Sequence, residues 1–413
     1  MSLTRRAWIS AAAALPMVQS ARAADLVAAP AMSTALPARA AFAAMSTTYL
    51  NAGSVHPFSL GAAKAVQDFA AERTLAQGEP RWSLDATDER IRKAFAALVK
   101  VSPDELCLVQ STTSGEQLVT QALGLPRKGA RVVSDTLHFF GSFYLYEAFA
   151  RAGVEVHWVK PRDGRSIDYA DLEAAVTPGT TLVAVSAVST INGFEHDLKR
   201  VSEIAHAKGA LVYADIIHAA GAVPLDLAAS GVDFAACSGY KWLMGDFGLG
   251  FLYARRESMQ RLKRSQFGYE QLQSFATHVY PFDAPGGEVA DYAPRDDATG
   301  FFATGTTSGS AAAQLAYSLD YISALGVEAI QRHRQPLLDH ARRALERRGH
   351  ACITPEGSRS PLLAFAYEGA AERLAPKLDA AKVTITLSKN RFRISPSVFN
   401  DLADIDRLLA ALA

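Results

Sequence analysis

The chain has few cysteines, no excess of charge of one sign and no long apolar run. Its 413 residues include three cysteines, Cys107, Cys237 and Cys352. Three are too few for a disulfide framework and show no metal-ligand spacing, so we expect buried free thiols and no metal site. The 42 basic residues equal the 42 acidic ones, which argues against a nucleic-acid partner. Since no apolar run is long enough to span a bilayer, we expect no membrane anchor in the mature chain.

Residues 1–24 have the pattern of an export signal. Arg5 and Arg6 precede a short apolar segment, and an A-x-A cleavage pattern follows at 21–24. The paired arginines resemble a twin-arginine signal, which exports folded proteins, so we expect a periplasmic protein. A basic leader without a targeting role is the alternative. The alanine-rich segment 25–45 is predicted to be a linker.

The remainder of the chain predicts an α/β fold with two domains. Near-continuous apolar strands alternate with helical segments from about residue 86, which indicates a mostly parallel sheet covered on both faces. We expect a large domain over 46–305 and a smaller C-terminal α+β domain over 306–413. Residues 46–60 are expected to pack near the small domain or over the cleft. The predicted strands of the large domain are Leu106–Val109, Arg131–Ser134, Val154–Val159, Thr181–Ser186, Ala210–Ala214 and Val232–Ala236.

Polar side chains at the ends of these strands suggest the chemistry. Lys241 follows the strand that ends at Ala236, in a turn of small residues where an amine is poorly hydrated. Poor hydration lowers a lysine pKa and suits the amine to Schiff-base formation. Asp215 ends the preceding strand, and ligands of parallel sheets bind at this edge. A lysine facing a carboxylate there suggests pyridoxal phosphate, whose ring nitrogen Asp215 would keep protonated.

Two further features fit this cofactor, although each has a simpler explanation. His218 could reach the phenolic oxygen of the ring, or it could be a loop histidine without a role. The segment Thr112–Gly115 opens a helix and offers backbone N–H groups to a phosphate. By itself this segment could equally be an ordinary Ser/Thr helix cap. Lys241 by itself could be a surface lysine.

From about residue 48 to 410 the chain resembles the class V aminotransferases of pyridoxal-phosphate fold type I. This group includes cysteine desulfurases, kynureninase and isopenicillin N epimerase-like proteins. The resemblance implies a three-layer fold with a mostly parallel sheet and a smaller C-terminal domain. The motifs that carry it are Thr112–Glu116, Tyr213–Ala219, Ser238–Lys241, Thr304–Thr307 and Phe392–Asn400.

The resemblance also implies a role for each matching residue. Lys241 would bind the cofactor aldehyde, Asp215 the pyridine nitrogen, and His218 would lie near the phenolic oxygen. The phosphate would be held by Thr112, Thr113, Ser238 and Tyr240, and Thr306 would reach the phosphate of the neighbouring subunit of a homodimer. His138 falls where an aromatic ring usually stacks on the cofactor, with Phe139 as the alternative, and Thr190 stands where the family often has an asparagine.

Arg393 matches the arginine that binds the substrate α-carboxylate in this family. A guanidinium can bind a carboxylate through two parallel hydrogen bonds. Arg391 and Arg393 share one face of the same strand, so the alternation of side chains does not choose between them. A solvated surface charge is the alternative for either residue.

The sequence indicates the reaction less clearly than it indicates the cofactor. Residues 382–391, just before Arg393, contain no cysteine, which argues against a cysteine desulfurase. We expect an enzyme that transforms an amino acid or peptide-like small molecule, first of all an aminotransferase. The alternatives are an isopenicillin N epimerase-like activity, a lyase, or a non-catalytic protein that kept the fold. An epimerase would benefit from a second acid, which His138 or Tyr49 could supply.

Residues 265–300 form a long aromatic and glycine-rich excursion before the motif that begins near Gly305. Long excursions of this kind often shape substrate access. A contact with a second subunit is the equal alternative.

Overall fold

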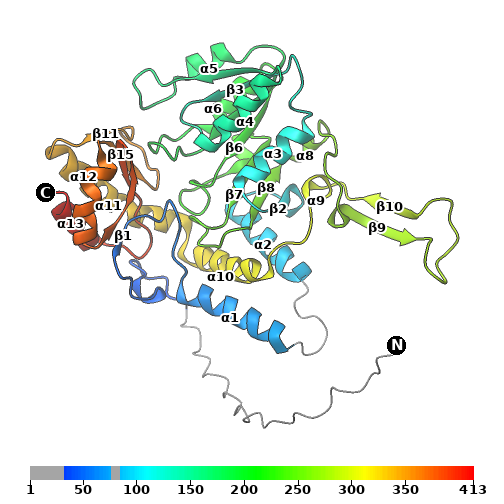
Figure 1. The fold of residues 1–413 in the computed structure, drawn as a ribbon, viewed down its shortest axis with the longest axis horizontal. Helices are drawn as coiled ribbons and strands as arrows, with labels where there is room; N and C mark the ends of the chain where they lie inside the picture. Colours follow the sequence, from blue (N-terminus) through cyan, green and yellow to red (C-terminus); the bar gives the residue numbers. More distant parts are fainter. Residues whose placement is uncertain (1–31, 76–83) are drawn as a thin grey trace, which may run out of the picture.

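The computed structural model describes residues 32–75 and 84–413 (Figure 1). Its main element is a seven-stranded sheet with the order β2-β8-β7-β6-β5-β3-β4. All neighbouring strands are parallel except β8, which pairs antiparallel with β2 and β7. The strands are β2 Leu106–Val109, β3 Arg131–Asp135, β4 Glu155–Val159, β5 Thr180–Ser186, β6 Leu211–Asp215, β7 Phe234–Ser238 and β8 Gly250–Ala254. The predicted α/β fold with a mostly parallel sheet is confirmed.

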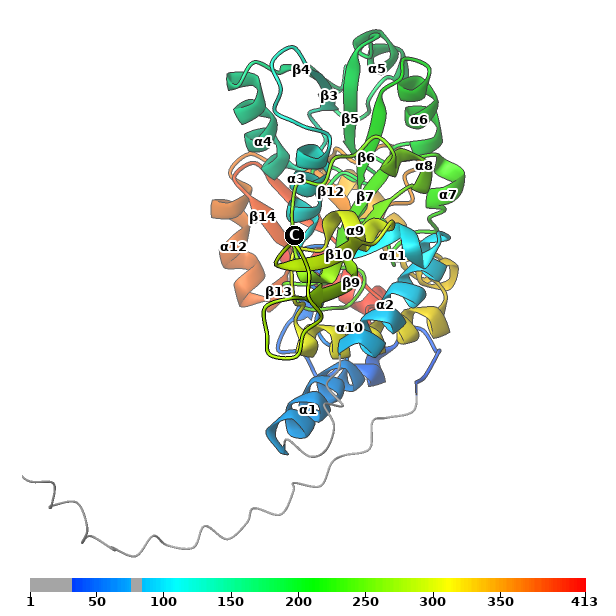
Figure 2. The same cartoon turned by 90° about the vertical axis from the view of Figure 1, so that its right-hand side faces the viewer.

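Apolar side chains point to both faces of this sheet, because successive residues of a strand alternate in direction. Val212 and Ala214 of β6 belong to one core, and Leu211 and Tyr213 belong to the core on the opposite face. The first core is covered by α2 Leu84–Val99, α5 Tyr169–Ala175, α6 Leu198–His206, α7 Leu227–Ser230 and α10 Gly309–Leu325. The second is covered by α3 Thr112–Ala122, α4 Phe140–Arg151, α8 Arg256–Met259 and α9 Ala298–Phe302. The helices on the two faces make this a three-layer domain (Figures 1 and 2).

The C-terminal domain has its own core around a four-stranded antiparallel sheet with the order β11-β12-β15-β14. The short strand β1 Thr48–Tyr49 pairs in parallel with β13 Val383–Thr384, and Leu50 is buried in this core. The expectation that residues 46–60 pack near the small domain agrees with this pairing. The other elements are β11 Ala351–Cys352, β12 Leu363–Ala366, β14 Thr386–Ser388, β15 Arg391–Ile394, α11 Val327–Arg347, α12 Ala370–Ala380 and α13 Leu402–Ala411.

The boundary between the domains differs from the predicted one at 305/306. Helix α10 packs on α2 and on α1 Leu60–Leu75, and its apolar side chains belong to the core of the large domain. Helix α11 then crosses from one domain to the other, since Ile330 lies in the large core and Leu337 in the small one. The division therefore falls within α11. The helix that connects the two domains thus begins about twenty residues after the predicted boundary.

The segment predicted as a linker is partly packed on the fold. Ala38 and Phe42 are buried, and the backbone N–H of Ala38 donates to the carbonyl of Val398 at 2.7 Å. The ring of Phe42 lies 4.9 Å from that of Phe399. The predicted signal peptide, residues 1–24, lies outside the described residues.

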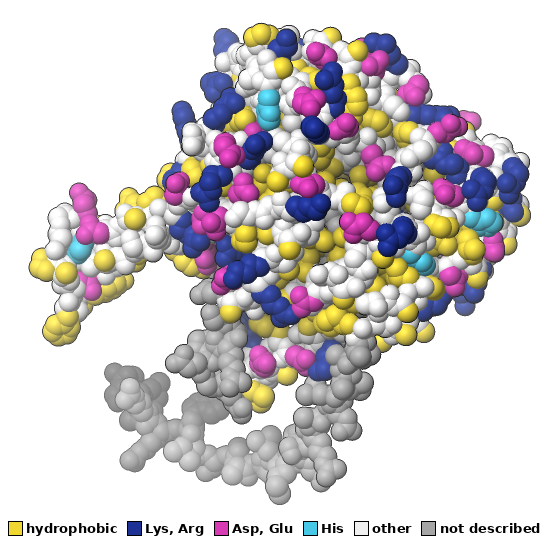
Figure 3. Space-filling model, turned by 180° about the vertical axis from the view of Figure 1, so that it is seen from behind, with side chains coloured by type: hydrophobic (Ala, Val, Ile, Leu, Met, Phe, Trp, Pro, Cys, Tyr) yellow, Lys and Arg dark blue, Asp and Glu magenta, His cyan; other side chains and the backbone are white. Residues whose placement is uncertain are grey.

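The excursion at 265–300, which leaves and re-enters the large domain, contains a two-stranded hairpin. β9 Leu272–Thr277 pairs antiparallel with β10 Ala290–Pro294, and the hairpin projects from the body of the molecule (Figures 1 and 3). Its side chains are largely exposed. Within the described ranges, no helix has both the length and the apolar character needed to cross a membrane.

Candidate active site

Strands β6 and β7 bring Asp215 and Lys241 to the same edge of the sheet. The two strands are parallel, and Asp215 pairs in register with Ala236. The chain then turns from Ser238 to Lys241, and both Asp215 and Lys241 are buried. A glycine is needed at position 245, because a Cβ atom there would lie 2.9 Å from the carbonyl oxygen of Gly239.

The amine of Lys241 lies in a basic and poorly hydrated environment. Its Nζ atom is 3.0 Å from Nε2 of His218. Burial lowers the pKa of Lys241 to about 8; the positive charge of Arg393 acts in the same direction, and the carboxylate of Asp215 opposes it. About half of this amine is therefore unprotonated at a mildly alkaline pH of about 8, far more than for an ordinary lysine, and Schiff-base chemistry requires the unprotonated form.

His218 lies between Lys241 and Trp242. The indole N–H of Trp242 donates to Nδ1 of His218 at 3.3 Å. Burial, reinforced by the charges of Lys241 and Arg393, lowers the pKa of His218 well below its usual value. The imidazole is therefore neutral.

Asp215 ends β6 with its carboxylate inside the protein. Its Oδ1 atom accepts a hydrogen bond from the backbone N–H of Ile217 at 3.0 Å. Burial raises the pKa of Asp215 above its usual value, although the charge of His138 opposes this effect. A carboxylate in this position can stabilise a protonated ring nitrogen.

The first turn of α3 lies against the end of β7. The backbone N–H of Thr112 donates to Oγ of Ser238 at 2.8 Å, and the backbone N–H of Ser238 donates to Oγ1 of Thr112 at 3.0 Å. Gly115 permits this contact, since a Cβ atom there would lie 2.7 Å from Cβ of Ala236. Helix α3 thus brings its positive end and two hydroxyl groups to the edge where Lys241 lies. Thr113 is exposed beside them.

Tyr240, also expected near the phosphate, is half-buried. Its ring stacks on Phe247 with 4.6 Å between the ring centres, and Nζ of Lys241 lies 5.7 Å from the centre of the Tyr240 ring. Thr306 hydrogen-bonds Tyr269 and lines a recess with Gln110 and Gly248.

Arg393 on β15 is buried and hydrogen-bonds neutral groups. Its Nη1 atom donates to Oγ1 of Thr190 at 2.6 Å, and its Nη2 atom donates to the hydroxyls of Ser54 and Thr386 at 3.0 and 3.1 Å. Its Nε atom is buried without a partner, and no carboxylate among residues 32–75 and 84–413 forms an ion pair with it. Burial lowers the pKa of Arg393 to about 10, and Arg391 adds to this. A buried guanidinium without a counter-ion is well suited to bind an anionic ligand.

His138 belongs to a buried network. Its Nε2 atom lies 3.1 Å from Oε1 of Glu116, and its Nδ1 atom lies 2.9 Å from Oγ of Ser186. Ser142 and Tyr146 of α4 also donate to Glu116. Burial disfavours the charge on Glu116 and on His138, but the attraction and hydrogen bond between the two outweigh burial. The pKa of Glu116 is therefore below its usual value, and the pKa of His138 is above its usual value.

Three site residues had no signal in the sequence. Ser54, Asn51 and Thr386 form a hydrogen-bonded group, and two of their hydroxyls contact Arg393. Asn51 and Ser54 come from the N-terminal arm, more than three hundred positions from Arg393. Only the tertiary fold brings them together. The contact of Trp242 with His218 was equally invisible in the sequence.

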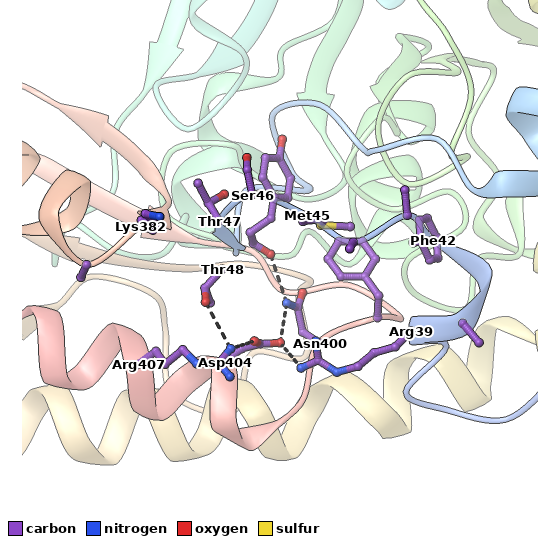
Figure 4. Close-up of a pocket in the computed structure, with 16 residues that line it drawn as sticks. Arg39, Phe42, Met45, Ser46, Thr47, Thr48, Lys382, Asn400, Asp404 and Arg407 are labelled. Carbon is purple, nitrogen blue, oxygen red and sulfur yellow. Dashed lines mark hydrogen bonds and ion pairs between the residues drawn. The ribbon is translucent and has the colours of Figure 1, made fainter.

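A separate cavity of about 620 Å³ lies between the N-terminal arm and the C-terminal domain (Figure 4). Phe42, Phe399 and Asp404 are among the residues that line it. The carboxylate of Asp404 is already paired with Arg39, Arg407 and the amide of Asn400. Since Lys241 does not line it, this cavity is not the candidate active site.

Comparison with known proteins identifies the family of the chain. Residues 63–389 match the family Aminotransferase class-V. Isopenicillin N epimerase of Streptomyces clavuligerus is 30% identical over 364 residues, which cover 84% of this chain and 86% of that protein. A probable cysteine desulfurase of Methanothermobacter thermautotrophicus is 29% identical over 293 residues, or 69% of each chain.

The fold has close counterparts among solved structures. The crystal structure of a cysteine desulfurase from Escherichia coli superposes with a TM-score of 0.78 at 21% identity, and covers 91% of this chain and 97% of that one. The family match confirms the prediction of pyridoxal phosphate as the cofactor. The chain belongs to the class V aminotransferase family of pyridoxal-phosphate-dependent enzymes.

Proposed function

We propose that this protein is an aminotransferase that acts on an amino acid or a peptide-like molecule carrying one. The observation that carries the proposal is the buried guanidinium of Arg393, which has no carboxylate partner among the described residues and acts electrostatically on Lys241. An α-carboxylate bound to Arg393 would orient the neighbouring amino group toward this edge of the sheet.

The residues present fit the cofactor. Lys241 offers a poorly hydrated amine to its aldehyde, and Asp215 offers a buried carboxylate to its ring nitrogen. His218 would donate to its phenolic oxygen. When bound, pyridoxal phosphate supplies an electron sink for the substrate carbanion. The proposed phosphate ligands are Thr112, Thr113, Ser238, Tyr240 and, from the neighbouring subunit, Thr306.

His138 and Thr190, both expected near the cofactor ring, need separate proposals. Both nitrogens of His138 are engaged by Glu116 and Ser186, so the His138 ring could contact the cofactor only through its face. Phe139, the next residue, is partly exposed and remains the alternative stacking residue. Thr190 would act through Arg393, whose guanidinium it binds.

A single base supports transamination. Lys241 would act as the base that moves the proton of the substrate α-carbon, and one mobile base is sufficient for the proton shift of transamination. Epimerisation benefits from a second acid, yet His138 is fully buried and doubly hydrogen-bonded, and the hydroxyl of Tyr49 donates to the carbonyl of Val55 at 2.7 Å. Neither candidate for the second acid is free in this structure.

A desulfurase mechanism has little support from the thiols. All three cysteines of the chain are buried. Burial raises the pKa of Cys107 to about 12, and it raises the pKa of Cys237 and of Cys352 as well. A reactive cysteine needs an accessible thiolate, and these three lack it.

Epimerisation is the second candidate function. It is favoured by the 30% identity with isopenicillin N epimerase over most of both chains. The difference is testable: an aminotransferase converts its cofactor to the amine form when given an amino donor without a keto acid, whereas an epimerase only exchanges the α-proton.

The visible spectrum of the purified protein tests the proposal. We expect absorbance from a cofactor bound through Lys241, which borohydride fixes to that residue, and bleaching of this band by a subset of amino donors. A colourless protein without a label on Lys241 would favour a non-catalytic protein. Deuterium incorporation at the α-carbon without bleaching would favour the epimerase.

We further propose a homodimer and a periplasmic location. The first follows from the role assigned to Thr306, and the second from the paired arginines at positions 5 and 6. Fractionation of cells that express the full-length chain, with and without both arginines changed to lysine, tests the location.

A further inference from the structure

Three buried side chains form a chain of contacts next to the candidate active site. Nζ of Lys241 lies 3.0 Å from Nε2 of His218, and Nε1 of Trp242 lies 3.3 Å from Nδ1 of the same ring. His218 and Trp242 are each 2% exposed and Lys241 is 8% exposed. Water therefore has little access to replace any of these contacts.

The position of the indole N–H is fixed by its surroundings. Trp242 packs in one buried cluster with Ala52 and Ala222. The guanidinium carbon of Arg334 lies 5.2 Å from the centre of the Trp242 ring, and Nη2 of Arg334 donates to the carbonyl of Ala222 at 2.6 Å. These contacts hold the indole with its N–H directed at His218.

The contact with Trp242 determines which nitrogen of His218 carries the proton. An indole N–H can only donate, so Nδ1 of His218 must accept. A neutral imidazole that accepts at Nδ1 carries its proton at Nε2. Nε2–H therefore faces the amine of Lys241 as a donor.

A donor at Nε2 requires an acceptor at Lys241. The free-base amine has a lone pair and can accept this hydrogen bond, whereas an ammonium group has only donors. The contact is therefore favourable for the unprotonated lysine alone. We propose that Trp242 is a positioning residue that fixes the Nε2–H tautomer of His218 and thereby favours the free-base form of Lys241.

The other groups around the amine of Lys241 do not fix the tautomer of His218 as Trp242 does. Asp215 favours the charged form, Arg393 opposes it, and Cys237 is a buried thiol of raised pKa. Arg393 also acts on His218, where it opposes a positive charge. None of these groups specifies which nitrogen of His218 is protonated.

With the cofactor bound, the same Nε2–H would be available to its phenolic oxygen. This last step rests on the proposed function, whereas the tautomer and the Lys241 protonation do not. The two can therefore be tested separately.

The tautomer can be measured directly by two-bond ¹H–¹⁵N spectra of the full-length protein labelled with ¹⁵N-histidine. The signals of His218 are identified by their absence in His218→Gln. In the protein without cofactor we expect the Nε2–H pattern, and in Trp242→Phe a mixture of both tautomers. Trp158→Phe, the same change in a tryptophan on β4 that packs on Phe143 and Tyr146, should leave the pattern of His218 unchanged.

The protonation of Lys241 gives a second readout. Without the indole donor, His218 can accept from an ammonium group, so the pKa of Lys241 in Trp242→Phe should rise by roughly half a unit to one unit. Titration of ¹³C-labelled lysine measures this shift, and Trp158→Phe is again the control.

An Nδ1–H or doubly protonated His218 in the wild type at pH 7.5 would overturn the inference. So would a Trp242→Phe protein that folds and keeps both the tautomer and the lysine pKa. If Trp242→Phe does not fold, the wild-type spectrum decides by itself. Failure to bind pyridoxal phosphate would contradict the proposed function and leave this measurement valid.

Discussion

At the scale of single residues, the proposed substrate class depends on the guanidinium of Arg393. Replacing it by lysine keeps the charge but loses the two parallel hydrogen bonds. We expect Arg393→Lys to raise KM for amino donors about 30-fold, which corresponds to a loss of about 2 kcal/mol in binding. Steady-state kinetics with the donor found by the absorbance screen measures the effect.

Arg391→Lys is the matched control, because Arg391 lies on the same face of β15 and donates to the backbone carbonyl of Ile191 instead. We expect its KM to change less than threefold. Equal effects of the two substitutions would contradict the role given to Arg393.

The choice between these arginines also marks a limit of sequence reasoning. Alternation along a strand places both side chains on one face, and only the resemblance to a family singled out Arg393. The structure separates them by their neighbours: the arm residue Ser54 and Thr190 meet Arg393. These partners come from distant segments, so no local pattern can reveal them.

At the scale of elements, the approach of α3 to β7 depends on Gly115. A methyl group at this position would lie 2.7 Å from Cβ of Ala236. Gly115→Ala should therefore move the first turn of α3 away from Ser238 and weaken cofactor binding by about tenfold, with a cost of about 1–3 kcal/mol from overpacking. Titration of the cofactor-free protein with pyridoxal phosphate, followed by absorbance, measures the affinity.

Gly287→Ala is the control for this change. A Cβ atom at position 287 meets nothing within 4 Å, and the backbone there has no left-handed conformation. If Gly115→Ala binds the cofactor as tightly as Gly287→Ala does, the close approach of α3 is not needed for the phosphate site.

The pair Glu116–His138 joins α3 to the segment before α4 and gives a pH-dependent prediction. The pKa of Glu116 is lowered by folding, so its contribution to stability is present above about pH 4.5 and is lost as the pH falls through the folded-state pKa. The pKa of His138 is raised, so its contribution is complete below about pH 6.5 and is lost as the pH rises through the folded-state pKa. The pair therefore stabilises most between these two values.

Glu116→Gln should lower the free energy of unfolding by about 3 kcal/mol in that window, since it leaves a buried charge without its partner. The difference from the wild type should shrink on both sides of the window. Urea unfolding from pH 4 to pH 8 checks this, with Glu147→Gln on the exposed face of α4 as the control. A difference that does not vary with pH would show that the two side chains are not an ion pair.

The sequence predicted the elements that are buried and missed those that are not. Strands such as Leu211–Asp215 are buried along their whole length, so their apolar runs are visible in the sequence. The hairpin of β9 and β10 is exposed on both strands and has no burial pattern to recognise. The boundary predicted at 305/306 rested on a change of sequence pattern after Gly305, whereas the apolar side chains of α10 pack into the core of the large domain.

At the scale of the whole molecule, the hairpin is the part that a single chain stabilises least. An isolated two-stranded hairpin is marginally stable in water, and this one carries large exposed apolar side chains toward its end (Figure 3). Phe275 and Tyr292 are cross-strand partners that are 61% and 68% exposed. Exposed apolar surface of this extent is typical of protein–protein contacts, which agrees with the proposed homodimer.

The double substitution Phe275→Ser and Tyr292→Ser should therefore weaken self-association. We expect the wild type to have a mass of about twice 44.2 kDa in light scattering after size exclusion. The variant should dissociate at protein concentrations at least tenfold higher than the wild type does, because burial of each aromatic contributes about 1.5–3 kcal/mol. Cofactor affinity should fall in parallel, since each site would lose the Thr306 of the neighbouring subunit.

Leu402→Ser is the matched control, because Leu402 is 50% exposed at the start of α13, in the small domain rather than on the hairpin. It removes an exposed apolar side chain and should leave the mass and the cofactor affinity unchanged. A hairpin variant that remains a dimer with unchanged affinity would mean that these two side chains face solvent in the assembly. The excursion would then belong to substrate access, the other function that its length and composition allow.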